Sequence, residues 1–194
     1  MSAGATVQEL EVRVQNVVAT ASLGSQLDLV AVMSALPDAK YKPTAFPGAV
    51  VKQKENGATF LLFSTGRLVC TGTKSEREAR TAVARLVRQL REKGFLINES
   101  VEVNIQNVVV SARLPGRVDI ERMATTFENV LYEPDQFPGI IYRLPDSKAV
   151  ALLFASGRLV VVGSKSEEEA HENVRRVYEE VRDRGLLIGT LGRA

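Results

Sequence analysis

The strongest constraint on the fold is an internal repeat with a period of 91 residues. The segments QNVV, FPG and GRLV each occur twice, starting at residues 15 and 106, 46 and 137, and 66 and 157. Aligned without gaps from residue 12 to residue 97, about 33 of 86 positions are identical in the two copies, far more than chance allows. We therefore expect two copies of one unit, repeat 1 in residues 1–97 and repeat 2 in residues 98–194, related by a pseudo-twofold axis.

Each repeat is predicted to fold as a strand, a helix, several short strands and a long helix. In repeat 1, residues 12–18 alternate as in a strand, and residues 27–36 have apolar side chains at helical spacing. A capping box of Ser75 and Glu78 begins the long helix, and Gly94 ends it. Repeat 2 follows the same order, which predicts an α+β chain. The short strands of repeat 1 are expected at residues 49–52, 58–63 and 67–71.

The predicted strands carry apolar side chains on both faces, although two helices per repeat can cover only one face of a sheet. In residues 59–63, Phe60 and Leu62 share one face, and Leu61 and Phe63 share the other. An uncovered apolar face of this size indicates a binding surface. A homodimer that stacks sheet on sheet would cover the same face, so both interpretations stay open at this point.

Charge and composition exclude several classes of function. The net charge is only +2, and no apolar run approaches the roughly 20 residues that span a bilayer. No nucleophile–base pair, glycine-rich phosphate loop or metal-ligand spacing is found, so we expect no enzyme, cofactor or metal. His171 is expected on an exposed helix face, and the single cysteine, Cys70, in the core.

The two halves nevertheless differ in charge. Residues 1–97 carry 13 basic and 8 acidic side chains, a net charge of +5, and residues 98–194 carry 12 and 15, a net charge of −3. Such an asymmetry indicates that the two ends of the molecule meet different partners.

The repeated QNVV, FPG and LLFxxGRLVxxG segments resemble the two direct repeats of the TATA-box-binding protein family, over about residues 12–187 without a gap. The resemblance implies a saddle in which both repeats form one curved antiparallel β-sheet with four helices on the convex face. It implies a general transcription initiation factor that binds the minor groove of A·T-rich TATA-box DNA and kinks it. The alternative is a protein-binding module or a sheet-stacked homodimer that uses the exposed apolar face.

The apolar face suits the floor of an A·T minor groove. Guanine adds an amino group to that floor, and apolar side chains packed against the floor would clash with it. They therefore select A·T without many hydrogen bonds. Asn16 and Asn107 share a strand face with valines. By the symmetry of the repeats they are expected near the pseudo-twofold axis, where they would donate to acceptors on the central base pairs. The alternative for an asparagine here is satisfaction by the backbone at a bulge. The expected base-contacting residues are Asn16, Asn107, Val18, Val109, Val69, Val160, Thr71, Val162, Leu61 and Leu152.

Four phenylalanines match the intercalating wedges of the family. A wedge must be large, flat and apolar in order to replace base stacking at a kinked step. Burial in the core is the usual fate of phenylalanine, but two of the four precede Pro-Gly in a turn, where a ring is difficult to bury. The expected wedges are Phe46, Phe63, Phe137 and Phe154.

Phosphate contacts are expected from basic residues at matching positions, Lys52 and Arg143, and Arg67 and Arg158. Solvated strand-end charges are the alternative. One departure from the family pattern is that repeat 2 has a valine, Val162, where a second threonine is common. If the hydroxyl bonds a base, the two halves read DNA unequally.

The turn before the second Phe-Pro-Gly segment is acidic. Carboxylates beside a DNA-inserting turn repel phosphates, so they require another explanation. In the family, this turn docks transcription factor B, which recruits RNA polymerase, and the partner-binding residues implied here are Glu133, Asp135 and Gln136. The resemblance is closest to archaeal members, which implies a cytoplasmic location, or a nuclear one if the chain is eukaryotic. A weak homodimer through the concave face is expected when DNA is absent.

Overall fold

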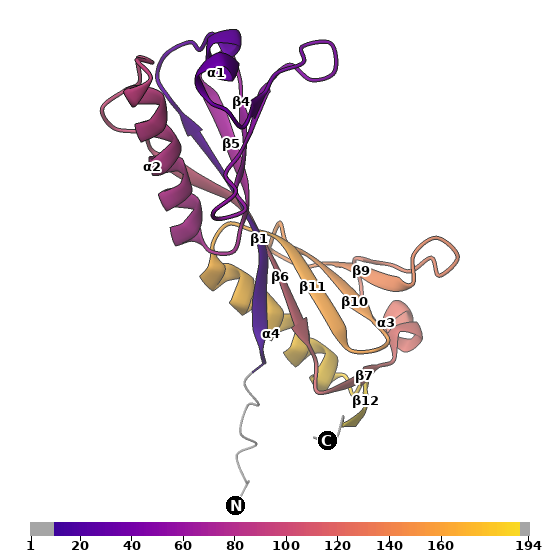
Figure 1. The fold of residues 1–194 in the computed structure, drawn as a ribbon. Coiled ribbons are helices and arrows are strands. Elements are labelled where there is room, and N and C mark those ends of the chain that lie inside the picture. Colours follow the sequence, from indigo (N-terminus) through magenta and orange to yellow (C-terminus); the bar gives the residue numbers. More distant parts are fainter. Residues whose placement is uncertain (1–9, 191–194) are drawn as a thin grey trace, which may run out of the picture. The chain divides into compact units, whose positions relative to one another are not determined.

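The computed structural model describes residues 10–190, and the elements of each repeat follow the predicted order (Figure 1). Repeat 1 forms β1 (Val12–Ser22), α1 (Leu29–Ala35), β2 (Ala39–Lys40), β3 (Ala49–Lys52), β4 (Thr59–Leu62), β5 (Arg67–Thr73) and α2 (Glu76–Glu92). Repeat 2 forms β6 (Val103–Arg113), β7 (Gly116–Val118), α3 (Ile120–Thr126), β8 (Val130–Leu131), β9 (Gly139–Arg143), β10 (Val150–Phe154), β11 (Arg158–Ser164), α4 (Glu167–Asp183) and β12 (Leu187–Thr190).

The strands are hydrogen-bonded in the order β2-β3-β4-β5-β1-β6-β11-β10-β9-β8, and β7 pairs separately with β12. Contacts divide the chain into two compact units. The N-terminal unit holds residues 14–109 and 165–167, and the C-terminal unit holds the described residues of the remainder. Strand β6 contributes to both units. The division into residues 1–97 and 98–194 follows the sequence repeat and stays a prediction.

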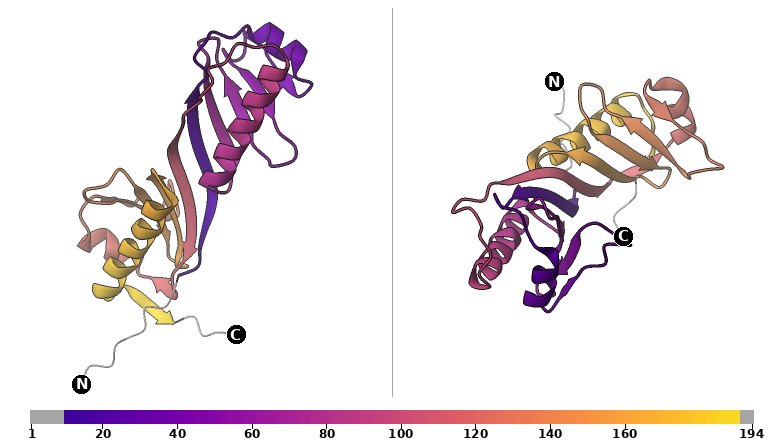
Figure 2. Two further views of the ribbon diagram at one scale, coloured as in Figure 1. Left: turned by 90° about the vertical axis from the view of Figure 1, so that its left-hand side faces the viewer. Right: turned by 90° about the horizontal axis from the view of Figure 1, so that it is seen from above.

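The long helix α2 begins and ends where the sequence predicts. Its N-cap Ser75 accepts a hydrogen bond from the amide of Glu78, and the Glu78 carboxylate accepts one from the amide of Lys74. Gly94 has φ +87°, the left-handed conformation that glycine adopts at a helix C-terminus. Figure 2 shows α2 and α4 each lying along one side of the strands in its own unit. The buried stripe of α2 is Ala79, Ala82, Val83, Leu86, Val87 and Leu90.

The first helix is shorter than the sequence predicts. Residues 27–36 have helical periodicity, but α1 covers only Leu29–Ala35. Asp28 is the N-cap, because its carboxylate accepts hydrogen bonds from the amides of Val30 and Ala31. Leu27 instead donates its amide to the carbonyl of Ser64. Among the described residues, none of the helices has both the length and the apolarity that a membrane span requires.

The strands alternate between a covered and an open side, as expected. Phe60 and Leu62 in β4 are fully buried under the helices, whereas Leu61 and Phe63 are only half-buried. In β10, likewise, Leu153 is buried beside half-buried neighbours. Each unit therefore presents a half-exposed apolar surface on the side of its strands away from the helices, which we call its open face.

Candidate nucleic-acid interface

The open face of each unit gathers the residues that the sequence predicts to contact bases. In the N-terminal unit every one of them is half-buried and follows the strand alternation: Asn16, Val18, Leu61, Val69, Thr71, Asn107 and Val109. In the C-terminal unit, Leu152, Val160 and Val162 do the same. Val50 and Ile141 join them at matching positions of β3 and β9. Sequence reasoning missed this last pair, although the alternation of residues 49–52 carries the signal.

A groove of about 1000 Å³ opens on the N-terminal unit. Its lining combines an aromatic ring, Phe63, with the apolar Val69 and the cation Arg67. Polar side chains complete it, and the Gln106 amide donates a hydrogen bond of 2.9 Å to the Thr20 hydroxyl. Such a groove can contact bases through its apolar surface and ring, and phosphates through its cation.

The four phenylalanines form two matching pairs. The rings of Phe46 and Phe63 have centroids 5.9 Å apart, and those of Phe137 and Phe154 have centroids 5.5 Å apart. All four rings are half-buried, so none is a fully packed core residue. Phe63 and Phe154 lie on the open face, opposite the buried leucines that precede them. Each pair therefore leaves part of its aromatic surface accessible.

Asn16 is held in a defined orientation. Its Oδ1 accepts a hydrogen bond of 2.8 Å from the amide of Gly72, which fixes the assignment of the side-chain oxygen and nitrogen. Its Nδ2 donates to the Thr71 hydroxyl at 3.0 Å. The pairing of β1 and β5 shifts register here, and Gly72 has φ +91°. The backbone at a bulge therefore satisfies the oxygen, while the nitrogen carries a second hydrogen that Thr71 does not take.

Repeat 2 differs at this position. Asn107 corresponds to Asn16, but Val162 stands where repeat 1 has Thr71. Because valine has no hydroxyl, the hydrogen bond between Asn16 and Thr71 has no counterpart from residue 162. The two asparagines therefore have different surroundings within the same strand pattern.

The four predicted phosphate-contacting residues are exposed and belong to the open side of their strands. Lys52 ends β3 two residues beyond the half-buried Val50, and Arg67 begins β5 two residues before the half-buried Val69. Arg143 and Arg158 occupy the matching places in β9 and β11. The structure thus puts a cation at the end of two open-face strands in each unit.

The turns that precede the Phe-Pro-Gly segments share a backbone and differ in charge. In repeat 1 the carbonyl of Lys42 accepts hydrogen bonds from the amides of residues 45 and 46. In repeat 2 the carbonyl of Glu133 accepts the equivalent bonds from residues 136 and 137. Glu133, Asp135 and Gln136 are all exposed, and within residues 10–190 neither carboxylate forms a salt bridge. The acidic side chains are therefore exposed to solvent, and the turn forms the same backbone hydrogen bonds in repeat 1 without them.

The remaining chemically reactive side chains do not form a site. His171 is exposed on α4. Cys70 is buried, and its burial raises the pKa of the thiol to about 11. Within residues 10–190, no three or more histidine, cysteine, aspartate and glutamate side chains are grouped as a metal site would need.

Comparison with known proteins identifies the family. The family model described as transcription factor TFIID, or TATA-binding protein, matches residues 11–93 and 102–184. The TATA-box-binding protein of Archaeoglobus fulgidus is 42% identical over 183 residues, which cover 93% of this chain and all of that protein. That of Methanothrix thermoacetophila is also 42% identical, over 92% of this chain and all of the relative.

A solved structure agrees with these sequence relatives. The Methanococcus jannaschii TATA-binding protein superposes with a TM-score of 0.83 at 36% identity, covering 89% of this chain and 99% of the other. The match confirms the predicted fold, a large antiparallel sheet with four helices built from two repeats. This chain belongs to the TATA-binding protein family.

Proposed function

We propose that this protein is a general transcription initiation factor that binds the minor groove of A·T-rich promoter DNA through its open faces. The observation that carries the proposal is the likeness of the two open faces, whose positions are half-exposed. Five open-face pairs are identical in the two repeats: Asn16/Asn107, Val18/Val109, Leu61/Leu152, Phe63/Phe154 and Val69/Val160. Other open-face pairs differ, such as Val50/Ile141 and Thr71/Val162. The buried pairs likewise include identical residues, such as Leu62/Leu153, and different ones, such as Phe60/Ala151.

Half-exposed positions usually tolerate substitution better than buried ones, so five identical pairs on one face require an explanation. A ligand that presents the same chemistry to both repeats accounts for these identical pairs. The minor groove does so, since A·T and T·A pairs both expose only acceptors there. Valine and leucine side chains fit that floor, and the guanine amino group would clash with them.

The test is a binding titration with three duplexes of one length: a TATA-like sequence, the same sequence with inosine·cytosine in place of A·T, and a G·C control. Inosine·cytosine keeps the A·T pattern of the minor groove and alters the major groove. We expect the first two duplexes to bind alike and the third to bind at least about tenfold more weakly. Loss of binding to the inosine duplex would contradict minor-groove recognition.

The phenylalanine pairs supply the wedges in this proposal. Their half-buried rings support it, because a ring with free surface is available to stack on a base. Phe137→Ala and Phe154→Ala should reduce the DNA bend measured by energy transfer, while the melting temperature changes little. A stability loss of about 3–5 kcal/mol in both variants would instead identify these rings as core residues.

The asparagines are proposed to donate to acceptors of the central base pairs. Asn16→Ala and Asn107→Ala should each weaken specific binding by about 1–3 kcal/mol, the usual worth of a base contact. Affinity for random-sequence DNA serves as the control. An equal loss on random DNA would mean that the asparagines shape the sheet and do not read bases.

The acidic turn is proposed to bind transcription factor B, which in turn recruits RNA polymerase. The exposed carboxylates of Glu133 and Asp135 support this role, because they offer acceptors to basic groups of a partner. Changing Glu133→Arg together with Asp135→Lys should keep or tighten DNA binding and abolish the ternary complex. The matched control, Lys42→Glu with Thr44→Asp in repeat 1, should keep the ternary complex. A charge-reversed second turn that still recruits factor B would exclude this contact.

In this proposal the protein works in the cytoplasm of an archaeal cell, as a binding protein without catalytic activity. Without DNA, the apolar open faces would support a weak homodimer. Sedimentation with and without duplex separates the two uses of the surface. If DNA dissociates the dimer, the open faces serve both contacts. If the protein binds DNA as an intact dimer, the dimer contact lies elsewhere.

A further inference from the structure

Each phenylalanine pair encloses one glycine. Gly48 and Gly139 follow the Phe-Pro sequence in the two repeats, and both are buried. Neither has a φ in the left-handed region, so the backbone conformation does not require glycine at either position. Another reason must account for the absence of a side chain here.

The space around the two glycines supplies that reason. A Cβ at Gly48 would lie 2.8 Å from Cε1 of Phe46, 3.3 Å from Cε1 of Phe63 and 3.0 Å from the carbonyl oxygen of Leu62. Cβ atoms essentially never lie less than 3.0 Å from such an atom, so the Phe46 ring would have to move.

Repeat 2 has the same arrangement. A Cβ at Gly139 would lie 3.0 Å from Cε1 of both Phe137 and Phe154, and 3.1 Å from the carbonyl oxygen of Leu153. The three surrounding groups are thus equivalent in the two repeats. The same contact is therefore kept in both copies of the repeated unit.

Strand register explains why both rings meet at this point. Gly139 pairs directly with Phe154 across β9 and β10. The pairing of Ala49 with Leu62 places Gly48 opposite Phe63 in the same way. A side chain at either glycine would point to the open face, between the ring on the neighbouring strand and the ring from the preceding turn.

We propose that Gly48 and Gly139 are positioning residues. Because they have no side chain, they let the phenylalanine rings take the position and tilt that insertion into the DNA needs. This inference rests on the proposed wedge role of the rings. The carbonyl oxygens belong to paired strands and are rigid, whereas a ring moves by rotation about its side-chain bonds. An added methyl group therefore displaces the rings before it disturbs the sheet.

The experiment compares Gly139→Ala and Gly48→Ala with the unsubstituted protein in three measurements. The first is ring geometry in the free protein, read from nuclear Overhauser contacts between the paired rings. The second is the DNA bend from energy transfer, and the third is the melting temperature. We expect altered ring contacts, a smaller bend and an affinity loss of about tenfold, or about 1.4 kcal/mol, with a nearly unchanged melting temperature.

A double-mutant cycle provides the control. In a Phe137→Ala, Phe154→Ala background, Gly139→Ala should change neither bend nor affinity further, because the rings through which it acts are absent. An additional loss of the same size in that background would overturn the positioning role. So would unchanged ring contacts and bend in Gly139→Ala itself.

The two proposals fail in different ways. If the ring-deleted protein bends DNA normally, the wedge function is wrong, whatever Gly139→Ala does to the ring contacts. If the ring-deleted protein no longer bends DNA and Gly139→Ala still bends it normally, the wedge function is supported and the positioning role of the glycine is wrong. Gly139→Val extends the series, since a larger side chain should displace the rings further.

Discussion

The two repeats build one fold around different interiors. In repeat 1, Val51 of β3 lies directly opposite Phe60 of β4. In repeat 2 the same two places hold Tyr142 and Ala151, which are also paired directly. The aromatic ring has moved to the neighbouring strand, and a small residue faces it in each case. The core therefore requires that the combined volume of the pair be filled, and either strand can supply the ring.

Moving the ring gives repeat 2 a polar network that repeat 1 lacks. The Tyr142 hydroxyl donates a hydrogen bond of 2.7 Å to the Glu180 carboxylate, which also pairs with Arg176 and Arg184 at 3.3 Å each. The Arg184 guanidinium lies 3.9 Å from the ring centre of Phe127. In repeat 1, Val51, Gln89 and Lys93 occupy the places of Tyr142, Glu180 and Arg184, so those three sites hold no such network.

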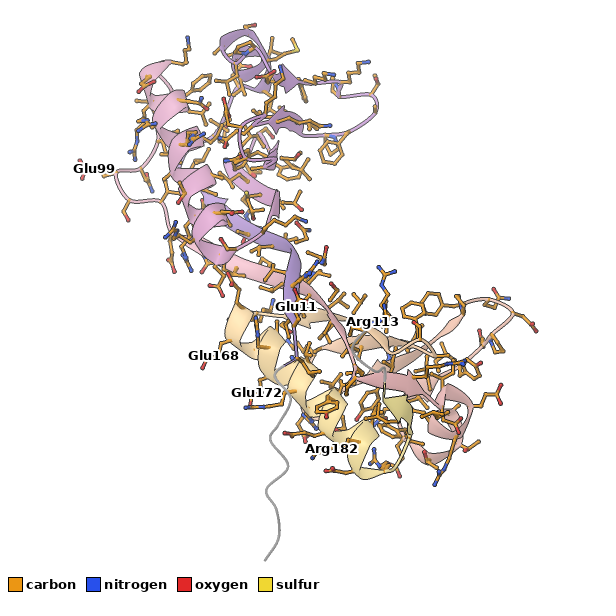
Figure 3. The ribbon with its side chains drawn as sticks, turned by 60° about the horizontal axis from the view of Figure 1, so that its bottom comes forward. Glu11, Glu99, Arg113, Glu168, Glu172 and Arg182 are labelled. Atoms are coloured by element: carbon orange, nitrogen blue, oxygen red, sulfur yellow. The ribbon has the colours of Figure 1, made fainter. Side chains whose placement is uncertain are left out.

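The long helices also differ in charge. Helix α2 has five arginines and three glutamates, a net charge of +2, whereas α4 has three arginines and seven acidic residues, a net charge of −4. Figure 3 shows Glu168 and Glu172 pointing away from α4. The charge difference between the halves thus lies mainly on helix surfaces, while the cations of the open face are matched.

The largest effect on stability is expected when repeat 1 loses the aromatic ring of its paired core positions. Phe60→Ala makes repeat 1 small at both paired positions, so we expect the free energy of unfolding to fall by about 3–5 kcal/mol. Chemical denaturation measures the loss.

The matched variant adds Val51→Tyr to Phe60→Ala, which copies the pair of repeat 2. It should recover a substantial part of the lost stability, because a ring again fills the space. If the double variant loses as much free energy of unfolding as its two single variants together, the ring cannot simply move between the strands. Its place on β9 would then depend on surroundings that only repeat 2 has.

How well the sequence predicts a structural feature depends on how far apart in the chain the interacting residues are. Ser75, Glu78 and Gly94 predict the ends of α2 because caps are local signals. The start of α1 was misplaced because Leu27 fits the helical period, and the period does not reveal that Asp28 caps the helix. The sequence names backbone satisfaction of Asn16 at a bulge only as an alternative. It cannot decide the question, because the hydrogen bond from Gly72 depends on a register shift that brings together residues 56 positions apart.

The polar network of repeat 2 provides the next test. Tyr142→Phe removes a hydrogen bond to a charged group, for which we expect a loss of about 1.5–3 kcal/mol in the free energy of unfolding. Burial and the Glu180 hydrogen bond raise the pKa of Tyr142. Its neutral form is therefore favoured in the folded protein, and its contribution to stability declines above about pH 10, the ordinary tyrosine pKa.

Thermal melts from pH 7 to pH 11 should accordingly show a smaller difference between Tyr142→Phe and the unsubstituted protein as the pH rises. Tyr132→Phe is the control, because Tyr132 is half-buried on the edge of the C-terminal unit. Equal losses in the two variants would remove the special role of the Glu180 contact.

A smaller, pH-limited effect is expected at Cys70, which repeat 2 replaces with Val161. Burial raises the pKa of the thiol to about 11, so ionisation favours the unfolded chain as the pH rises above about 8.5, the ordinary cysteine pKa. Cys70→Val should match the original stability at pH 7 and exceed it at pH 10. Parallel pH profiles for the two proteins would show that the thiol does not titrate differently on folding.

The smallest expected effect concerns an open-face difference that changes a hydrogen bond of Asn16, Thr71 against Val162. Thr71→Val removes the 3.0 Å partner of the Asn16 nitrogen and leaves the Gly72 contact in place. The asparagine keeps its orientation but is less restrained, so we expect specific DNA affinity to fall by about 0.5–1 kcal/mol, the net worth of one neutral hydrogen bond. Thr71→Ser retains the hydroxyl and should bind as before. In an Asn16→Ala background, Thr71→Val should cost nothing more if the hydroxyl acts through the asparagine. An undiminished loss in that background would mean that Thr71 contacts DNA itself and that the two repeats read their half-sites unequally.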